Sequence, residues 1–353
     1  MIYPFTRLRF LRLHELNVVI KVTLFYSKGV CFLMKNDVSP PMAAAVPRPS
    51  KFQRFFNTIK RQKALQVMAL LGVVWMIIFH YIPLTGLWIA FSHFNIARPI
   101  FDAPFAGLTY FRQFFSDPNI PRVLYNTLGI SFFRIVIGFP IPIIFAIFLS
   151  EMRHQRYKKL VQTVSYLPHF VSWVILGGFI INWTAESGLI NDILLRTGLR
   201  STPIHLLGDA RYFWGVAVVS DIWRSMGWGA IIYIAAIASI NPELYEGALI
   251  DGANRFRRIW HITLPSIKGT IAILFTFAVA GLLSSNFEQV FVLRNPLNIE
   301  RAMVLDLYIF QVGIRLGRFS YATAVGLMRS IVALVLLIVA NRVSDRLTGA
   351  SFI

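Results

Sequence analysis

The sequence is poor in cysteine and in charge. Its one cysteine among 353 residues, Cys31, excludes an intrachain disulfide and a cysteine metal cluster. Only 14% of the residues are charged, whereas about a quarter of the residues are charged in a typical soluble domain. Because 56% of the residues are hydrophobic, the composition points to the lipid bilayer as the solvent for much of the chain.

Motifs for nucleotide binding and for common catalytic sites are also missing. The chain contains no G-x-x-x-x-G-K-[ST] phosphate loop, no H-E-x-x-H and no G-x-S-x-G. An enzyme function therefore has no catalytic constellation to rest on, and we expect no catalytic residue, no metal site and no cofactor within this chain.

Positive charge is plentiful, with a net charge of +19. The basic residues form short clusters between apolar runs and do not gather in one patch with interleaved aromatic residues. This distribution favours membrane topology as their role, and nucleic-acid binding is not expected.

Six apolar runs are long enough to cross a bilayer, which takes about twenty residues in a helix. They are continuously apolar and lack two-residue alternation, so they indicate helices and not barrel strands. The sequence thus predicts an all-α membrane protein with kinks at prolines inside several runs. The expected spans are 65–91, 124–150, 160–183, 212–240, 270–292 and 319–341, and the prolines are Pro83, Pro140, Pro142 and Pro168.

Lysine and arginine set the expected orientation, because they are enriched on the cytoplasmic side. They are denser in one alternating set of segments than in the other, so both termini should be cytoplasmic. The denser set is 51–64, 151–159, 241–268 and 341–353, and the sparser set is 92–122, 184–211 and 293–318.

The first fifty residues are difficult to place. Their apolar stretch, 17–34, is interrupted by Lys21 and Lys28, each of which costs roughly 2.5–3.5 kcal/mol at the middle of a membrane. We interpret this region as a dispensable extension. The expected organisation is an extension (1–50) that is disordered or precedes a start at Met34 or Met42, a cytoplasmic basic segment (51–64), a six-span membrane domain (65–342) and a cytoplasmic tail (343–353).

A polar segment, 243–266, separates the fourth and fifth expected spans. Asn241-Pro242 is a turn signal, the residues from Glu243 to Asn254 suit a short helix, and Gly252 should bend it. The stretch RFRRIWHI predicts a second amphipathic piece that ends at Leu264-Pro265. Small residues and two carboxylates would let a partner approach closely. The alternative is an ordinary interfacial loop with a cluster of positive charge.

The spacing in this segment resembles the EAA loop of binding-protein-dependent ABC importer permeases. That pattern reads E-A-A, three residues, G, nine residues and I-x-L-P, and the single departure here is Gly247 in place of alanine. The resemblance implies that the loop docks into the ATPase subunit. The matching residues are Glu246, Gly247, Ala248, Asp251, Gly252, Ala253, Ile262, Leu264 and Pro265.

The resemblance extends over about 60–350 and favours the carbohydrate branch, for oligosaccharides and polysaccharide fragments. Segments that carry it include HYIPLTGLWIAFSHFN (80–95), SYLPHFVSWVILGG (165–178) and NFEQVFVLRNP (286–296). It implies a type I ABC importer permease in the bacterial cytoplasmic membrane. The implied partners are a second permease or a second copy of this chain, two ATPase subunits that bind the ATP, an extracytoplasmic solute-binding protein and a carbohydrate.

A few polar residues lie within the expected spans, where they are costly. They predict either a polar translocation path or internal ion pairs and hydrogen bonds that fix the bundle. We favour ion pairing for Arg134 and Arg329. Asp221 and Arg224 lie three residues apart and can pair on one helix face. Candidates for the path are Asp221, Trp223, Arg224, Asn286, Glu288 and Gln289, and Trp183, Trp214, Trp223 and Trp228 can stack on sugars or serve as packing.

Two other classes of function remain as alternatives. An ion-coupled secondary transporter needs intramembrane carboxylates, for which Asp221 and Glu288 are candidates, and usually an internal repeat, which the sequence lacks. A membrane enzyme would need a catalytic site that the motifs do not provide.

Overall fold

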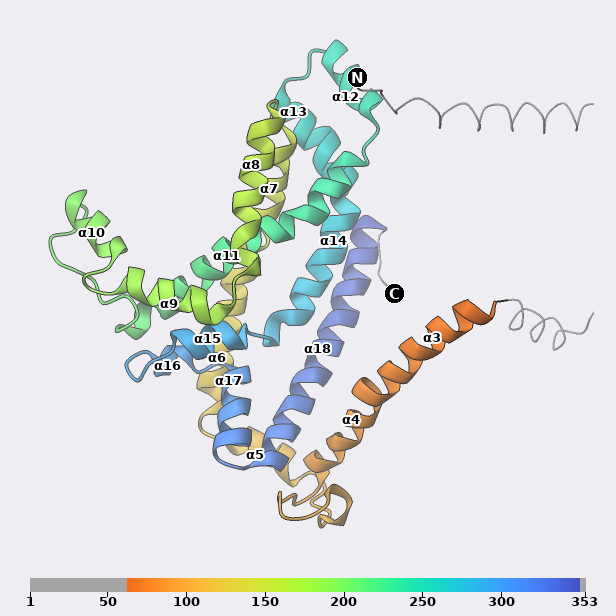
Figure 1. Cartoon of the computed structure of the whole chain (residues 1–353), viewed down its shortest axis with the longest axis vertical. Helices are drawn as coiled ribbons and strands as arrows, with labels where there is room; N and C mark the ends of the chain where they lie inside the picture. Colours follow the sequence, from red (N-terminus) through yellow and green to blue (C-terminus); the bar gives the residue numbers. More distant parts are fainter. Residues whose placement is uncertain (1–61, 350–353) are drawn as a thin grey trace, which may run out of the picture. The chain divides into compact units, whose positions relative to one another are not determined.

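The structure is a computed structural model that describes residues 62–349 (Figure 1). The chain divides into two units, with the boundary along the sequence between Val74 and Trp75. Within the first unit, the described residues 62–74 belong largely to helix α3 (Lys63–Met76), and all their side chains are exposed. The expected extension and most of the expected basic segment lie outside the described residues, as does the end of the expected tail.

In the described part of the second unit, helices are joined by turns and loops. The only β feature among residues 75–349 is an isolated bridge between Ser92 and Phe105, so the expected all-α fold is confirmed. Its helices are α4 (Ile82–Leu84), α5 (Thr109–Ser116), α6 (Ile120–Phe133), α7 (Pro140–Ser150), α8 (Gln155–Tyr166), α9 (Trp173–Thr184), α10 (Leu189–Arg196), α11 (Phe213–Ala238), α12 (Pro242–Ile250), α13 (Arg255–Arg258), α14 (Leu264–Ala280), α15 (Phe287–Leu293), α16 (Ile299–Ala302), α17 (Leu305–Phe310) and α18 (Phe319–Thr348).

Five helical stretches in residues 62–349 are long and apolar enough to cross a membrane. A sixth is obtained when Ala210–Ala238 is counted together with α12, which bends away from it by 71°. The first, second, fourth and sixth expected spans coincide with helical stretches to within about five residues. The five stretches are Lys63–Phe91, Ile120–Ser150, Trp173–Arg196, Arg255–Leu283 and Phe319–Arg346.

Two expected spans are placed wrongly by the sequence. The third, 160–183, is broken between α8 and α9. α8 ends at Tyr166, a short 3-10 turn that contains Pro168 follows, and Val171 and Ser172 then have extended backbone. The fifth, 270–292, begins earlier, at Arg255, and ends at Leu283. Hydropathy alone did not show the break after Leu283, because apolar residues lie on both sides of it.

Three prolines sit directly after a widened helical turn. The five-residue π turns at Ile77–Tyr81, Arg134–Gly138 and Ile259–Thr263 precede Pro83, Pro140 and Pro265. A proline ring clashes with the carbonyl four residues before it and cannot donate to that carbonyl. The extra residue in a π turn relieves both problems, so these helices continue through their prolines.

The buried core lies where α11 meets its neighbours. α7 packs along α11, with Ala146, Ala230 and Tyr233 fully or almost fully buried between them. α9 and α15 complete a second cluster around Trp173 and Phe213. Figure 1 shows α14 and α18 side by side, and α12 and α13 beyond the ends of α7 and α8. α11 is therefore the scaffold that positions the candidate sites.

Candidate functional site

The segment between α11 and α14 forms a helix, a turn and a second helix, as the sequence predicts for its first part. The side chain of Asn241 caps α12 by accepting from the N–H of Glu243 at 3.1 Å. α12 ends where Gly252 adopts a φ of +74°, a conformation that glycine tolerates best. Asn254 then caps α13 by accepting from the N–H of Arg257 at 2.9 Å.

The second part of this segment differs from the prediction. RFRRIWHI is not a separate amphipathic piece, and Leu264-Pro265 ends no helix. Instead α13 continues through the π turn into α14, so one helical rod runs from Arg255 to Leu283. The sequence predicts a terminator at this proline, but the π turn Ile259–Thr263 before it accommodates the ring and the missing N–H inside a continuous helix.

The segment exposes a large apolar surface. Ile250 is 87%, Phe256 82% and Trp260 70% exposed. The carboxylates of Glu246 and Asp251 are exposed as well, and no ion pair involves either of them within residues 62–349. A Cβ built on Gly247 or on Gly252 would meet nothing within 4 Å. Exposed apolar side chains beside open space and free carboxylates are typical of a docking surface.

Few side-chain contacts attach this surface to the neighbouring helices. The Tyr245 hydroxyl lies 2.9 Å from Oγ1 of Thr263, which joins α12 to the start of the rod. Arg255 lies 3.9 Å from the carboxylate of Glu151, at the end of α7. Ala248, Ala253, Ile262 and Leu264 are half-buried, whereas Pro265 is exposed.

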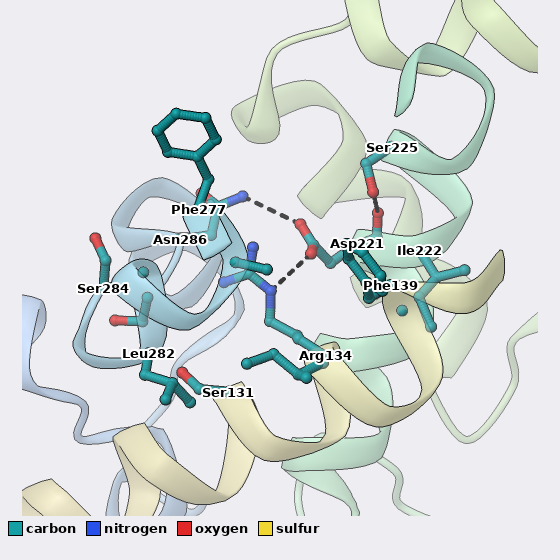
Figure 2. Close-up of a pocket in the computed structure, with 15 residues that line it drawn as sticks. Ser131, Arg134, Phe139, Asp221, Ile222, Ser225, Phe277, Leu282, Ser284 and Asn286 are labelled. Atoms are coloured by element: carbon teal, nitrogen blue, oxygen red, sulfur yellow. Dashed lines mark hydrogen bonds and ion pairs between the residues drawn. The ribbon is translucent and has the colours of Figure 1, made fainter. Parts of the chain in front are cut away.

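A second candidate site is a polar cavity of about 470 Å³ between α6, α11 and the end of the rod. Figure 2 shows Arg134 and Asn286 converging on the carboxylate of Asp221 from two sides. Arg134 Nε lies 2.9 Å from Oδ2 of Asp221, and Asn286 Nδ2 donates to Oδ1 at 3.4 Å. This site therefore holds an ion pair inside the helix bundle.

The expected pair between Asp221 and Arg224 is wrong. Asp221 is paired with Arg134, as the ion-pair interpretation of Arg134 anticipated. Arg224 instead donates to the carbonyl oxygens of His169, at 3.2 Å, and Val171, at 3.4 Å. Spacing on one helix allows a pair, but the broken backbone opposite offers Arg224 carbonyl groups that lack helical partners.

The guanidinium of Arg224 thus hydrogen-bonds to the connection between α8 and α9. It also lies 4.9 Å from the ring centroid of Trp173, over its face. Gly227, one turn further along α11, allows close approach, because a Cβ there would come within 2.3 Å of the carbonyl oxygen of Ser165. α8 and α11 are therefore in backbone contact beside the break.

Three aromatic side chains cluster at this break, and we call them the aromatic platform: His169, Phe170 and Trp228. The rings of His169 and Trp228 are stacked, with centroids 4.6 Å apart and planes 3° apart. Phe170 meets Trp228 edge-on at 5.7 Å. Phe170 is 72% and Trp228 46% exposed, so the platform presents aromatic surface outside the packed core.

The other expected path residues do not join these groups. Gln289 is buried and donates to the carbonyl oxygen of Ala217, at 2.6 Å, and to Oγ of Ser220, at 2.8 Å, so it fixes α15 to α11. Glu288 is exposed on α15. The rod ends before Asn286, Glu288 and Gln289, so these three residues are not part of the fifth span.

The remaining tryptophans are mainly packing residues. Trp223 meets Trp183 edge-on at 5.7 Å and lines an apolar cavity of about 340 Å³. Trp214 donates from Nε1 to the carbonyl oxygen of Arg301 at 3.2 Å. Their role as packing, one of the two interpretations of the sequence, agrees with these contacts.

The sequence interpretation missed the partner of Arg329. Its guanidinium is paired with Asp306 of α17, and the same carboxylate accepts from the N–H and Oγ of Ser285, at 2.8 and 3.0 Å. The ion pair expected for Arg329 is therefore present. Asp306 gave no signal, because it lies outside the expected spans.

A second missed group lies at the start of α6. The carboxylate of Asp117 accepts hydrogen bonds from the hydroxyls of Tyr308 and Tyr321, the latter at 2.8 Å. Burial alone would raise the pKa of Asp117, but these bonds and those from Asn119 outweigh it and hold the pKa below its usual range. Burial, together with the bond to Asp117, raises the pKa of Tyr308 to about 12.

In the described part of the chain, no group of three or more His, Cys, Asp or Glu side chains is arranged to hold a metal ion.

Comparison with known proteins supports this description. Residues 138–349 match the family described as "Binding-protein-dependent transport system inner membrane component". Protein LplB of Bacillus subtilis (strain 168) is 38% identical over 289 residues, which cover 82% of this chain and 90% of LplB. The polygalacturonan/rhamnogalacturonan transport system permease protein YteP of the same organism is 37% identical over 309 residues, covering 87% of this chain and 96% of YteP.

Solved structures show the same fold. A chain of a bacterial ABC transporter involved in the import of the acidic polysaccharide alginate is 37% identical, with a TM-score of 0.76 over 84% of this chain and 99% of that chain. The alginate transporter in complex with an alginate pentasaccharide-bound periplasmic protein gives a TM-score of 0.77 at 36% identity, with the same coverage. The chain therefore belongs to the family of binding-protein-dependent transport system inner membrane components, and it is a multi-pass ABC transporter permease subunit of the type I importer fold, not an enzyme.

Proposed function

We propose that this permease carries a carbohydrate, an oligosaccharide or polysaccharide fragment, across the bacterial cytoplasmic membrane. A solute-binding protein on the outer side would deliver the sugar, and two ATP-binding subunits on the inner side would drive its import. A second permease or a second copy of this chain would complete the channel. Relatives named for polygalacturonan, alginate and arabinooligosaccharides support this substrate class.

The observation that carries the proposal is the break between α8 and α9 with its aromatic platform. Arg224 and Trp228 lie close to the middle of α11, so the break lies at the level of the middle of a membrane-crossing helix. Non-helical backbone at that depth is stable only inside protein or beside a water-filled cavity. The exposed rings of Phe170 and Trp228 are therefore better explained by an aqueous path than by contact with lipid.

An aromatic surface in such a path suits a sugar. Pyranose rings carry apolar C–H faces, which pack on aromatic rings, and hydroxyl edges, which need polar partners. The cavity lined by Arg134, Asp221 and Asn286 offers such polar groups, and Asp221 lies on the same helix as Trp228, α11. Of the two candidates for ion coupling, Asp221 is ion-paired with Arg134 and Glu288 is exposed on α15, which does not favour ion-coupled secondary transport.

Coupling to ATP would occur through α12 and the start of the rod. The exposed Ile250 and Phe256 and the open space at Gly247 fit a groove of an ATPase subunit, and this chain itself would bind no cofactor. The density of lysine and arginine in the basic segments supports a cytoplasmic position for this loop and both termini. An ATPase that contacts the loop differently in its two states would shift the bundle between outward-open and inward-open forms.

The test is transport in proteoliposomes that contain this chain with its partner permease, its ATPase subunits and its loaded solute-binding protein. Trp228→Ala should lower the uptake rate about tenfold, which corresponds to about 1.4 kcal/mol. Trp228→Phe should retain most of the rate, because it preserves a ring. The matched control is Trp88→Ala, since Trp88 is 39% exposed and stacks on Phe105 in a different part of the chain. Wild-type uptake by Trp228→Ala would refute the platform as part of the path.

A further inference from the structure

The connection between the rod and α15 has an unusual set of partners. The rod is helical from Arg255 to Leu283, and α15 begins at Phe287. Between them, Ser284 and Asn286 have extended backbone conformations. Residues 284–286 are the covalent connection between the rod, which begins in the docking loop, and a helix that Gln289 fixes to α11.

Two carboxylates hold this link from different helices. Asp306 of α17 accepts from the N–H and the hydroxyl of Ser285, at 2.8 and 3.0 Å. Asp221 of α11 accepts from the side-chain amide of Asn286 at 3.4 Å (Figure 2). Ser285 is buried and Asn286 half-buried, so both contacts lie inside the helix bundle.

Each of these carboxylates is neutralised by an arginine from yet another helix. Arg134, in the π turn between α6 and α7, pairs with Asp221, and Arg329 of α18 pairs with Asp306. The Asp221 and Asp306 side chains are only 13% and 14% exposed. Charges at such depth are costly and usually mark functional positions. Four helices thus converge on two consecutive residues.

We propose that Ser285 and Asn286 form a hinge of the transport cycle, and that the ion-paired Asp221 and Asp306 position this hinge. This inference rests on the proposed function, because the movement would enter through the docked loop. A rigid rod transmits a displacement of Arg255 along its length to Leu283. Since α15 is fixed to α11, the backbone torsions at Ser285 and Asn286 must absorb the movement, as hinge residues at element ends do.

The two contacts at the hinge differ in strength and therefore in their expected role. The bond from Asn286 is long and pairs a neutral amide with a carboxylate, whereas Ser285 offers Asp306 two donors at shorter distances. The Asn286–Asp221 contact is thus the one that can open first. Opening it would separate the rod from α11 while Asp306 still holds Ser285.

The experiment measures sugar taken up per ATP hydrolysed in the complete reconstituted complex. Asn286→Asp places a second carboxylate beside that of Asp221, so repulsion should open the contact. Uptake per ATP should then fall about tenfold, within the 5- to 150-fold range of typical coupling, while ATP hydrolysis persists. The exchange variant Asp221→Asn with Asn286→Asp keeps the charge beside Arg134 and restores a donor and an acceptor, so it should recover most of the coupling.

Two serines supply a conservative variant and its control. Ser285→Ala removes only the hydroxyl bond to Asp306 and should lower uptake per ATP by about threefold. The control is Ser187→Ala, which should leave uptake per ATP unchanged, because Ser187 is exposed and lies between α9 and α10, away from the cavity and the hinge. Both variants change one oxygen atom, so insertion and folding should match those of the wild type.

Two results would overturn the hinge. One is unchanged uptake per ATP in Asn286→Asp and Ser285→Ala, and the other is uptake and hydrolysis that fall in proportion, as after a simple loss of folded protein. In both cases, ATP-driven sugar uptake by the wild type would leave the proposed function intact. A wild-type complex that hydrolyses ATP without importing any carbohydrate would instead refute the proposed function, and the hinge with it.

Discussion

The ion pair between Arg134 and Asp221 should be the strongest single electrostatic contact on α11, and its partners can be tested separately. Asp221→Asn leaves Arg134 without its counter-charge, and Arg134→Gln leaves Asp221 without its own. The double variant removes both charges. Because Arg224 bonds to backbone carbonyls and not to Asp221, the same cycle with Arg224→Gln serves as the control.

The magnitude follows from the geometry. At 2.9 Å, two unit charges attract by about 6 kcal/mol at an effective dielectric constant near 20. The Arg134 side chain is 33% exposed, and the desolvation cost opposes the attraction, so we expect each single variant to lose about 2–3 kcal/mol. The double variant should lose less than the sum, with a coupling energy of about 1–2 kcal/mol.

The assay is reversible unfolding of the purified chain in mixed micelles, followed by tryptophan fluorescence, for the wild type, the single variants and both double variants. The reasoning predicts coupling between positions 134 and 221 and near-additivity between 221 and 224. Additive effects at 134 and 221, or a coupling above about 1 kcal/mol between 221 and 224, would refute the arrangement described here.

Three further outcomes are expected. Gly247→Trp should abolish ATP-driven uptake, because its side chain fills the open space on α12. Gly247→Ala should retain uptake and stabilise the helix by about 0.5–1 kcal/mol. Normal uptake by the tryptophan variant would contradict ATPase docking at α12. Asp117→Asn should destabilise the chain at neutral pH. Because the folded-state pKa of Asp117 is lowered, its carboxylate contributes to stability above the ordinary pKa of 3.8, and this contribution is lost as pH falls through the lower folded-state pKa. A difference in unfolding free energy between wild type and variant that stays constant in this acid range would contradict the prediction. Arg224→Ala should lower the unfolding free energy by about 1–3 kcal/mol for each carbonyl left unsatisfied at the break, and Arg224→Lys should recover part of this loss. An unchanged unfolding free energy in Arg224→Ala would mean that water or backbone replaces the guanidinium.

The sequence predicted the helical class, four of the six spans, and the helix and turn at the start of segment 243–266. These features depend on local patterns: long apolar runs, the Asn241-Pro242 cap and the left-handed glycine at position 252. Each acts within a few residues, so a single sequence contains the necessary information.

Contacts between distant segments were harder to predict. Asp221 has Arg224 on its own helix face, yet its partner Arg134 comes from another helix, because the carbonyls of His169 and Val171 compete for Arg224. Prolines also misled, since a π turn lets the rod continue past Pro265, whereas the short 3-10 turn that contains Pro168 stops at Phe170 and leaves a break. Which outcome occurs depends on tertiary packing that spacing does not reveal.

The central claim is that this chain imports a carbohydrate by using ATP hydrolysed in partner subunits. The most direct measurement is uptake of labelled alginate, galacturonan and arabinan oligosaccharides into proteoliposomes containing the assembled complex and its solute-binding protein. We predict uptake of at least one of them that requires ATP and the binding protein and persists when ionophores abolish ion gradients. Uptake by this chain without ATPase subunits, and its loss on addition of ionophores, would contradict the account.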